Sequence, residues 1–395
     1  MGDIYENSHI TIAATASQDS NGGLFSSNRP VMRRLNKHPH LGVRKVLEAF
    51  PKTVIAMKNT SIPLLTRAWV YQERRLSTRT IHFAKDQVYW ECKTQFASED
   101  AGEDMTWKTH AEDFKDIPEA CWGDVLVDCT SRWQKMISEY SSLQLTYESD
   151  RLPAIAALAD RMSKLREVDD VYIAGMWKNS ILLDLLWLTR DHKPRPARTA
   201  PSWSWASTQS SVIVWDSFEF PQRANVVSLE YTATGAAVLG EVANASIVLL
   251  VPFLNLTGGH DRLSADLNDL NRGRHFEDIS SFALARTEFR KKCLEYESSI
   301  FFADYDLATT NPPYTPERAV KLLVAKDNLP GNSLCGIVVQ ETSKNAAEYE
   351  RIGSLFVRLK IMAHQPQEES IEDWEVDGRI DRLILSLPME EVKIV

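Results

Sequence analysis

The chain has 395 residues, of which 44% are hydrophobic and 25% are charged, and its formal net charge is −9 at pH 7. This length accommodates two or three domains of about 150 residues each, and the composition excludes disordered and fibrous proteins. The negative charge argues against nucleic-acid binding through phosphate contacts, because such binding needs a surplus of Lys and Arg on one face.

The cysteines predict a reduced compartment. Their number is odd, no Cys-x-x-Cys pair occurs, and the closest pair has no His at ligand spacing, so neither a disulfide framework nor a zinc site is expected. They are Cys92, Cys121, Cys129, Cys293 and Cys335. The N-terminus lacks the apolar run of a secretory signal, and the most apolar stretch, residues 246–254, is too short to span a bilayer. We therefore expect a cytoplasmic protein with no membrane span and no bound metal.

The first predicted element is a buried strand over residues 10–14, which are β-branched and apolar and precede a polar loop over residues 17–23. In an open α/β sheet, ligands bind beyond the carboxyl ends of strands, so this loop would lie at the mouth of a cleft. Asp19 and Gly23 are therefore candidate binding residues, although a flexible turn is an equally good interpretation. The loop carries no phosphate-binding glycine motif.

An amphipathic helix is predicted over residues 64–77. Trp69 and Glu73 are four residues apart and share one helix face. The adjoining stripe consists of Leu65, Ala68, Gln72 and Leu76. A carboxyl group on such a stripe is partly desolvated, which raises its pKa and makes Glu73 a candidate acid, base or electrostatic stabiliser. The alternative is a structural ion pair between Glu73 and Arg67 or Arg74.

Residues 79–83 and 88–92 alternate in character around a short turn, which predicts a hairpin. We expect one face of it to be buried, formed by Ile81, Phe83, Val88, Trp90 and Cys92. His82 and Glu91 would then lie on the opposite face. Because His82 has no partner at fixed spacing, we interpret it as a surface or hydrogen-bonded residue rather than a catalytic one.

The middle of the chain changes period. Residues 96–116 are acidic and polar, which indicates a surface loop. From residue 121 to 190, apolar residues recur at three- and four-residue spacing, which predicts a small helical bundle with buried tryptophans and with helices over 152–165 and 172–188. A proline-interrupted connection follows over residues 193–198.

The remaining half is predicted to be β-rich, and Trp203 and Trp205, two residues apart, would share a buried strand face. Helices do not alternate with the strands, so we expect antiparallel pairing. The further strands are predicted over residues 211–215, 226–234, 245–253, 322–325, 333–340 and 355–363. A helix is predicted near residues 282–296, and the acidic run 366–381 is interpreted as a solvated tail or, alternatively, a partner-binding tail.

Several of these blocks occur in an order typical of a known family. They are Ile4-Tyr5, Ile10-Thr11-Ile12-Ala13-Ala14, Gly22-Gly23-Leu24-Phe25, residues 64–77, Tyr89-Trp90-Glu91-Cys92, Asp150-Arg151-Leu152-Pro153 and Trp203-Ser204-Trp205-Ala206-Ser207. This series resembles a fungal heterokaryon-incompatibility (HET) domain over most of residues 1–207, with a weaker echo at residues 349–353. The resemblance implies a role in non-self recognition and programmed cell death. Family members usually carry strands upstream of a methionine that corresponds to Met1, so we expect the N-terminal part of the domain to be missing.

The resemblance also implies a fold and a chemistry. HET domains are likened to Toll/interleukin-receptor domains, so we expect a partial α/β HET sheet with a helical segment, followed by a β-rich, mainly antiparallel C-terminal domain. The expected domains are residues 1–95, 96–200 and 201–395. Some Toll/interleukin-receptor domains cleave NAD with a helix-borne Glu beside a Trp. This similarity implies Glu73 as the catalytic residue, with Arg67, Trp69 and Gln72 binding NAD as a substrate and no cofactor required.

Two functions therefore stay open. The first is a signalling or interaction module that recruits protein partners, which we favour because the domain would be incomplete. The second is an NAD glycohydrolase that uses Glu73. A Ser or Cys hydrolase is set aside, because the sequence holds neither a Gly-x-Ser-x-Gly elbow nor an ordered Cys/His pair.

Overall fold

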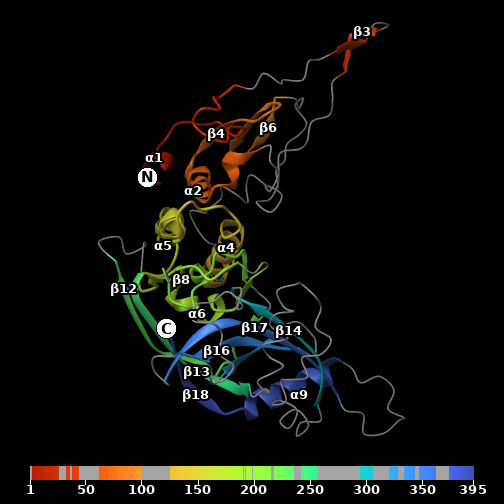
Figure 1. Cartoon of the computed structure of the whole chain (residues 1–395). Coiled ribbons are helices and arrows are strands. Elements are labelled where there is room, and N and C mark those ends of the chain that lie inside the picture. Colours follow the sequence, from red (N-terminus) through yellow and green to blue (C-terminus); the bar gives the residue numbers. More distant parts are fainter. Residues whose placement is uncertain are drawn as a thin grey trace. The chain divides into compact units, whose positions relative to one another are not determined.

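The structure is a computed structural model. It describes residues 2–25, 33–35, 38–43, 62–93, 95–99, 125–189, 191, 193–197, 199–214, 218–234, 242–256, 294–305, 320–327, 333–342, 347–361 and 373–395. The chain forms two compact units (Figure 1). The first consists of Met1–Val125 with Glu139–Glu167, and the second of Leu126–Ser138 with Val168–Val395. The expected division into domains at residues 95 and 200 stays a prediction.

The first unit contains a four-stranded sheet in the order β1-β4-β5-β6. Strand β1 runs parallel to β4, and the other two pairings are antiparallel, so the predicted hairpin of β4 and β5 is confirmed. The strands are β1 (Thr11–Ala13), β4 (Arg79–Phe83), β5 (Val88–Cys92) and β6 (Phe96–Ser98). A separate antiparallel pair is formed by β2 (Arg33–Leu35) and β3 (His38–Val43).

Burial on this sheet corrects two predictions. The strand predicted over residues 10–14 is present as β1, but its predicted burial is wrong, because β1 is the terminal strand in the order of the described sheet and Ile12 is 61% exposed. On the hairpin, the buried face is the one that carries His82 and Glu91, which are 0% and 1% exposed. The face predicted to be buried is only half-buried; its residues are Ile81, Phe83, Val88, Trp90 and Cys92. A polar face can be covered here because Arg74 pairs with the buried Glu91 carboxylate.

The predicted helix over residues 64–77 is divided at Arg67, whose extended backbone (ψ 132°) separates a 3-10 turn from helix α2. The Ala68 backbone N–H, at the start of α2, donates to the carbonyl of Gln144 at 2.9 Å. The helix ends at Ser77, because the backbone of this residue is extended (ψ 127°). Its N–H and its hydroxyl both donate to the carbonyl of Glu73. The helical elements of this unit are α1 (Gly2–Glu6), η2 (Pro63–Thr66), α2 (Ala68–Leu76), η3 (Glu148–Arg151), η4 (Pro153–Ile155) and α5 (Ala156–Ser163).

The second unit contains an eight-stranded, mainly antiparallel sheet, which confirms the β-rich C-terminal half. Strands β13, β15, β16, β17 and β18 pair in a closed ring, with a parallel pairing between β17 and β18 only. The strands of this sheet are β11 (Phe218–Glu219), β12 (Asn225–Ala233), β13 (Val242–Leu256), β14 (Leu294–Ala303), β15 (Val320–Asp327), β16 (Ser333–Glu341), β17 (Glu348–Ile361) and β18 (Met389–Ile394). Smaller pairs are β7 (Tyr172–Ile173) with β8 (Met176–Trp177), and β9 (Trp187–Thr189) with β10 (Val212–Val214).

Two predictions about this half are wrong. Helix α9 (Asp373–Ser386) occupies most of the acidic run that was interpreted as a tail, because Ile380, Leu383 and Leu387 lie at helical spacing and join the core of the strand ring (Figure 1). The prediction of a helix near residues 282–296 is wrong at its C-terminal end, since residues 294–296 belong to β14. The part of that prediction before residue 294 lies outside the described residues, as does most of the loop predicted over residues 96–116.

Helices are present as predicted at α4 (Val125–Tyr140) and α5, but not over residues 172–188. These form the β7–β8 hairpin, the short helix α6 (Ile181–Asp184) and β9. The hairpin turn has positive φ angles at Ala174 (49°) and Gly175 (94°). Its carbonyls are buried acceptors: Trp133 and Trp205 each donate an indole N–H to the Gly175 carbonyl at 2.9 Å, and Ser204 donates its hydroxyl to that of Ala174.

Trp203 and Trp205 are both 0% exposed, which confirms their predicted burial, but they lie in a turn and a 3-10 helix rather than on a strand. Beside them, the fully buried Arg351 bonds to Asp304 at 2.9 Å and to the carbonyls of Leu185 and Trp187. Its guanidinium also stacks 3.5 Å from the Trp187 ring centroid. This one side chain therefore links three segments of the core.

Candidate functional site

Glu73 lies near the C-terminal end of α2, half-buried, and its carboxylate accepts a hydrogen bond from the Tyr5 hydroxyl of α1. Desolvation by burial raises the pKa of Glu73, and the Tyr5 bond and the positive charge of Arg67 oppose this rise. Burial and the charge of Glu73 raise the pKa of Tyr5 to about 12. Within the described residues, neither Arg67 nor Arg74 forms an ion pair with Glu73. The group is therefore a partly desolvated carboxylate paired with a neutral phenol.

The other predicted site residues of α2 have structural partners. Trp69 donates its indole N–H to Asp150 of η3 at 2.9 Å. Gln72 is 3% exposed, and its side-chain carbonyl accepts the backbone N–H of Ala157 at the start of α5 at 2.7 Å. Arg67 is exposed and acts on Glu73 only through its charge. Trp69 and Gln72 thus connect α2 to other elements of the unit, and Glu73 connects it to α1.

Asp19 and Gly23 lie in the exposed loop that follows β1. Asp19 accepts the backbone N–H of Asn21 at 2.8 Å, and Gly23, with φ 71°, accepts the hydroxyl of Ser17 on its carbonyl. These bonds stay within the loop, and the described residues show no contact between the loop and Glu73. The glycine is needed at position 23 because a left-handed backbone is costly for other residues.

A buried polar chain runs from α2 through the hairpin to the end of β1. Arg74 donates from Nε and Nη2 to the two carboxylate oxygens of Glu91 at 2.8 and 3.0 Å. His82 Nε2 lies 2.8 Å from Glu91 Oε2, and its Nδ1 lies 3.1 Å from the Thr15 hydroxyl. Strand alternation predicts that His82 and Glu91 share one face of the hairpin, but it does not connect them to Arg74. The signal for this partner is the guanidinium one position after Glu73, on another face of α2.

A second polar cluster, formed by Tyr71, Arg75 and Glu139, lies on the side of α2 that faces away from Glu73. Tyr71 donates its hydroxyl to Glu139 at 2.7 Å, and Arg75 reaches the same carboxylate at 3.3 Å. Taken together, the polar side chains of α2 bond to α1, β5, the end of α4, η3 and α5. Chemically, Glu73 is left as the one carboxylate of this helix, half-exposed, that could act on a bound molecule.

The described part of the chain contains no group of three His, Cys, Asp or Glu side chains that could hold a metal ion. None of its helices is long and apolar enough to cross a membrane.

Comparison with known proteins places the Tyr5–Glu73 pair in a family context. Residues 1–73 match the family model described as heterokaryon incompatibility protein (HET), and both residues of the pair fall within this range. No curated protein and no solved structure matches the chain. The resemblance predicted from the aromatic-rich blocks is thus confirmed for the first 73 residues. The first 73 residues of this chain are therefore similar to the heterokaryon incompatibility (HET) family.

Proposed function

We propose that this protein is a signalling or interaction module of fungal non-self recognition and programmed cell death, acting in the cytoplasm through protein partners. The family match over residues 1–73 is the observation that carries the proposal. The contacts of α2 support it, because Trp69 and Gln72 are each hydrogen-bonded to a neighbouring element of the unit. A Toll/interleukin-receptor-like fold for the HET region is part of the same proposal.

A second candidate function, cleavage of NAD, rests on Glu73. Breaking the glycosidic bond to nicotinamide passes through an oxocarbenium-like state, and a desolvated carboxylate beside the ribose would stabilise its positive charge. Arg67 would then bind a phosphate and Trp69 would shape the nicotinamide pocket. The Tyr5 hydroxyl already occupies a lone pair of the Glu73 carboxylate, so it would have to yield to the substrate.

One experiment separates the two functions. The full chain is expressed from an inducible promoter in a filamentous fungus, and both hyphal death by vital dye and cellular NAD by chromatography are measured. The interaction module predicts death with no NAD loss before it, and Glu73→Gln should kill as the parent does. The exposed Asp169→Asn is the matched control for an uninvolved carboxylate.

The outcomes that contradict each function differ. A folded parent chain that never affects growth removes the cell-death role. NAD loss that precedes death and disappears together with death in Glu73→Gln replaces the interaction module with the hydrolase. Removing a transition-state electrostatic partner costs about 100- to 1,000-fold in turnover, so a residual activity would be measurable.

A further inference from the structure

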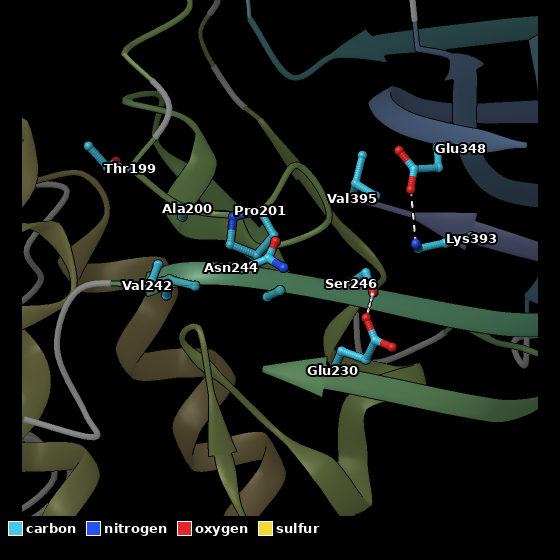
Figure 2. A pocket seen from close by; sticks show the side chains of 12 residues that line it. Thr199, Ala200, Pro201, Glu230, Val242, Asn244, Ser246, Glu348, Lys393 and Val395 are labelled. Atoms are coloured by element: carbon cyan, nitrogen blue, oxygen red, sulfur yellow. Dashed lines mark hydrogen bonds and ion pairs between the residues drawn. The ribbon is translucent and has the colours of Figure 1, made fainter. Parts of the chain in front are cut away.

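The second unit has a polar cavity of about 380 Å³, to which the proposed function assigns no role. Figure 2 shows its lining: the start of β13, Glu230 of β12, Glu348 of β17, Lys393 of β18 and the segment 199–201. Its volume is within the range of about 300–1,000 Å³ typical of ligand sites, but its polar lining does not suit an apolar ligand.

One wall of the cavity is a short free sheet edge. The pairing of β13 with β18 begins at Ile247, whose partner is Ile394, and continues along β13 to Pro252. The five residues before it, Val242–Ser246, pair with β12 on one side, and no described strand pairs with them on the other. In an antiparallel pair, the N–H and C=O groups of alternate residues point away from the partner strand. Backbone donors and acceptors of β13 therefore face the cavity.

The cavity also carries a net negative charge. Glu230 accepts the Ser246 hydroxyl at 3.1 Å, and Glu348 pairs with Lys393 at 2.9 Å, as the dashed lines of Figure 2 show. The bond and the charge of Glu348 raise the pKa of Lys393, and Glu230 adds to this rise, so its field reaches the same ammonium group. Two carboxylates face one ammonium, and carboxylates accept up to about four hydrogen bonds each. Acceptor capacity is left over for a cationic donor.

We propose that this cavity binds an extended peptide segment of a partner protein, which adds to the free edge of β13 and pairs one Arg or Lys side chain with Glu230 and Glu348. The assignment deepens the proposed function and rests on it, because it gives the chemistry of a partner for an interaction module. Strand addition supplies sequence-independent hydrogen bonds, and the carboxylates supply selection for a basic residue.

The test is fluorescence anisotropy with the full chain and an acetylated, fluorescein-labelled pentapeptide, Thr-Val-Arg-Val-Thr. The same peptide with citrulline in place of Arg has nearly the same shape but no charge. We expect the Arg peptide to bind about two- to fivefold more tightly, as for a solvent-accessible ion pair. Glu230→Gln and Glu348→Gln should each reduce this preference. Glu391→Gln is the matched control, because Glu391 is an exposed carboxylate of β18 outside the cavity.

Three results would overturn the assignment: equal binding of the two peptides, no effect of either cavity substitution in variants with the parent melting temperature, or free arginine amide that competes as well as the whole peptide. The last would leave a small-cation site and no strand addition. Failure of this assignment is separable from failure of the function. If the peptide does not bind while induced expression still kills hyphae, the cavity assignment falls and the interaction module stands.

Discussion

Replacing Arg74 by Met should destabilise the first unit strongly, because it leaves the carboxylate of Glu91, 1% exposed, without its guanidinium. The change removes two charge-assisted hydrogen bonds of 2.8 and 3.0 Å, whereas the bond to His82 remains. Breaking a buried ion pair on one side costs about 3–5 kcal/mol, and the remaining bond places the expected loss near the lower value, about 3 kcal/mol. Arg75→Met is the matched control on the same helix.

The control should cost about 1 kcal/mol, because the side chain of its partner Glu139 is 22% exposed and keeps a bond from Tyr71. Hydrogen exchange measured by mass spectrometry on β4 and β5 reports the local stability of this unit. Because about 1.4 kcal/mol corresponds to a factor of ten, Arg74→Met should lower protection there about 100-fold and Arg75→Met about fivefold. Equal losses in the two variants, or less than a tenfold loss for Arg74→Met, would refute the structural role of the buried pair.

Three further changes test other parts of the structure. In a urea titration, Ala174→Gly should keep the free energy of unfolding within about 0.5 kcal/mol of the parent. Relief of the left-handed backbone offsets the lost methyl group and the added freedom of the unfolded chain. Ala325→Gly, equally buried in β15, should lose about 1–2 kcal/mol in the same titration. Arg351→Met should cost at least about 3–5 kcal/mol by tryptophan fluorescence, and adding Asp304→Asn should restore part of it; no restoration contradicts the pairing. Because its folded pKa is raised, Glu73 lowers stability as pH increases from the ordinary carboxyl range through that pKa, so Glu73→Gln should have the flatter melting profile between pH 4 and 7, and identical profiles would oppose the desolvation argument.

Periodic signals predicted much of the fold. The strand predicted over residues 333–340 is β16 (Ser333–Glu341), a run buried on both faces, and that over 226–234 is β12 (Asn225–Ala233), in which exposed and half-buried residues largely alternate. Both patterns are local in the sequence. The local pattern gave a wrong prediction for residues 172–188, where a helix was expected. Its three- and four-residue spacing arises from a hairpin, a short helix and a strand whose apolar residues all point into one core.

The candidate site was predicted less completely, because its energetics depend on residues far apart in the chain. A raised pKa for Glu73 followed from its apolar stripe and was correct in direction, but its partner Tyr5 lies 68 positions away and no spacing rule connects the two. The face of the hairpin that carries His82 and Glu91 was predicted to be exposed, but it is buried, and the reason is related. A face that carries His and Glu has few apolar residues, so the sequence pattern predicts that it faces solvent. Its burial becomes understandable only with Arg74, which neutralises the Glu91 carboxylate.

The carbonyl of Gly175 has a consequence for how such genes exchange parts. This oxygen accepts hydrogen bonds from Trp133, 42 positions before it, and from Trp205, 30 positions after it. Both indoles belong to the second unit, although residues 139–167 between them belong to the first. A recombination event that replaced everything after residue 200 would import a new Trp205 but keep the resident Trp133 and the resident turn. Such a hybrid would lose about 0.5–1.5 kcal/mol unless the incoming half offered an indole to the same oxygen. The C-terminal half can therefore diversify along its strands while the sequence around that oxygen stays tied to the N-terminal part of the gene.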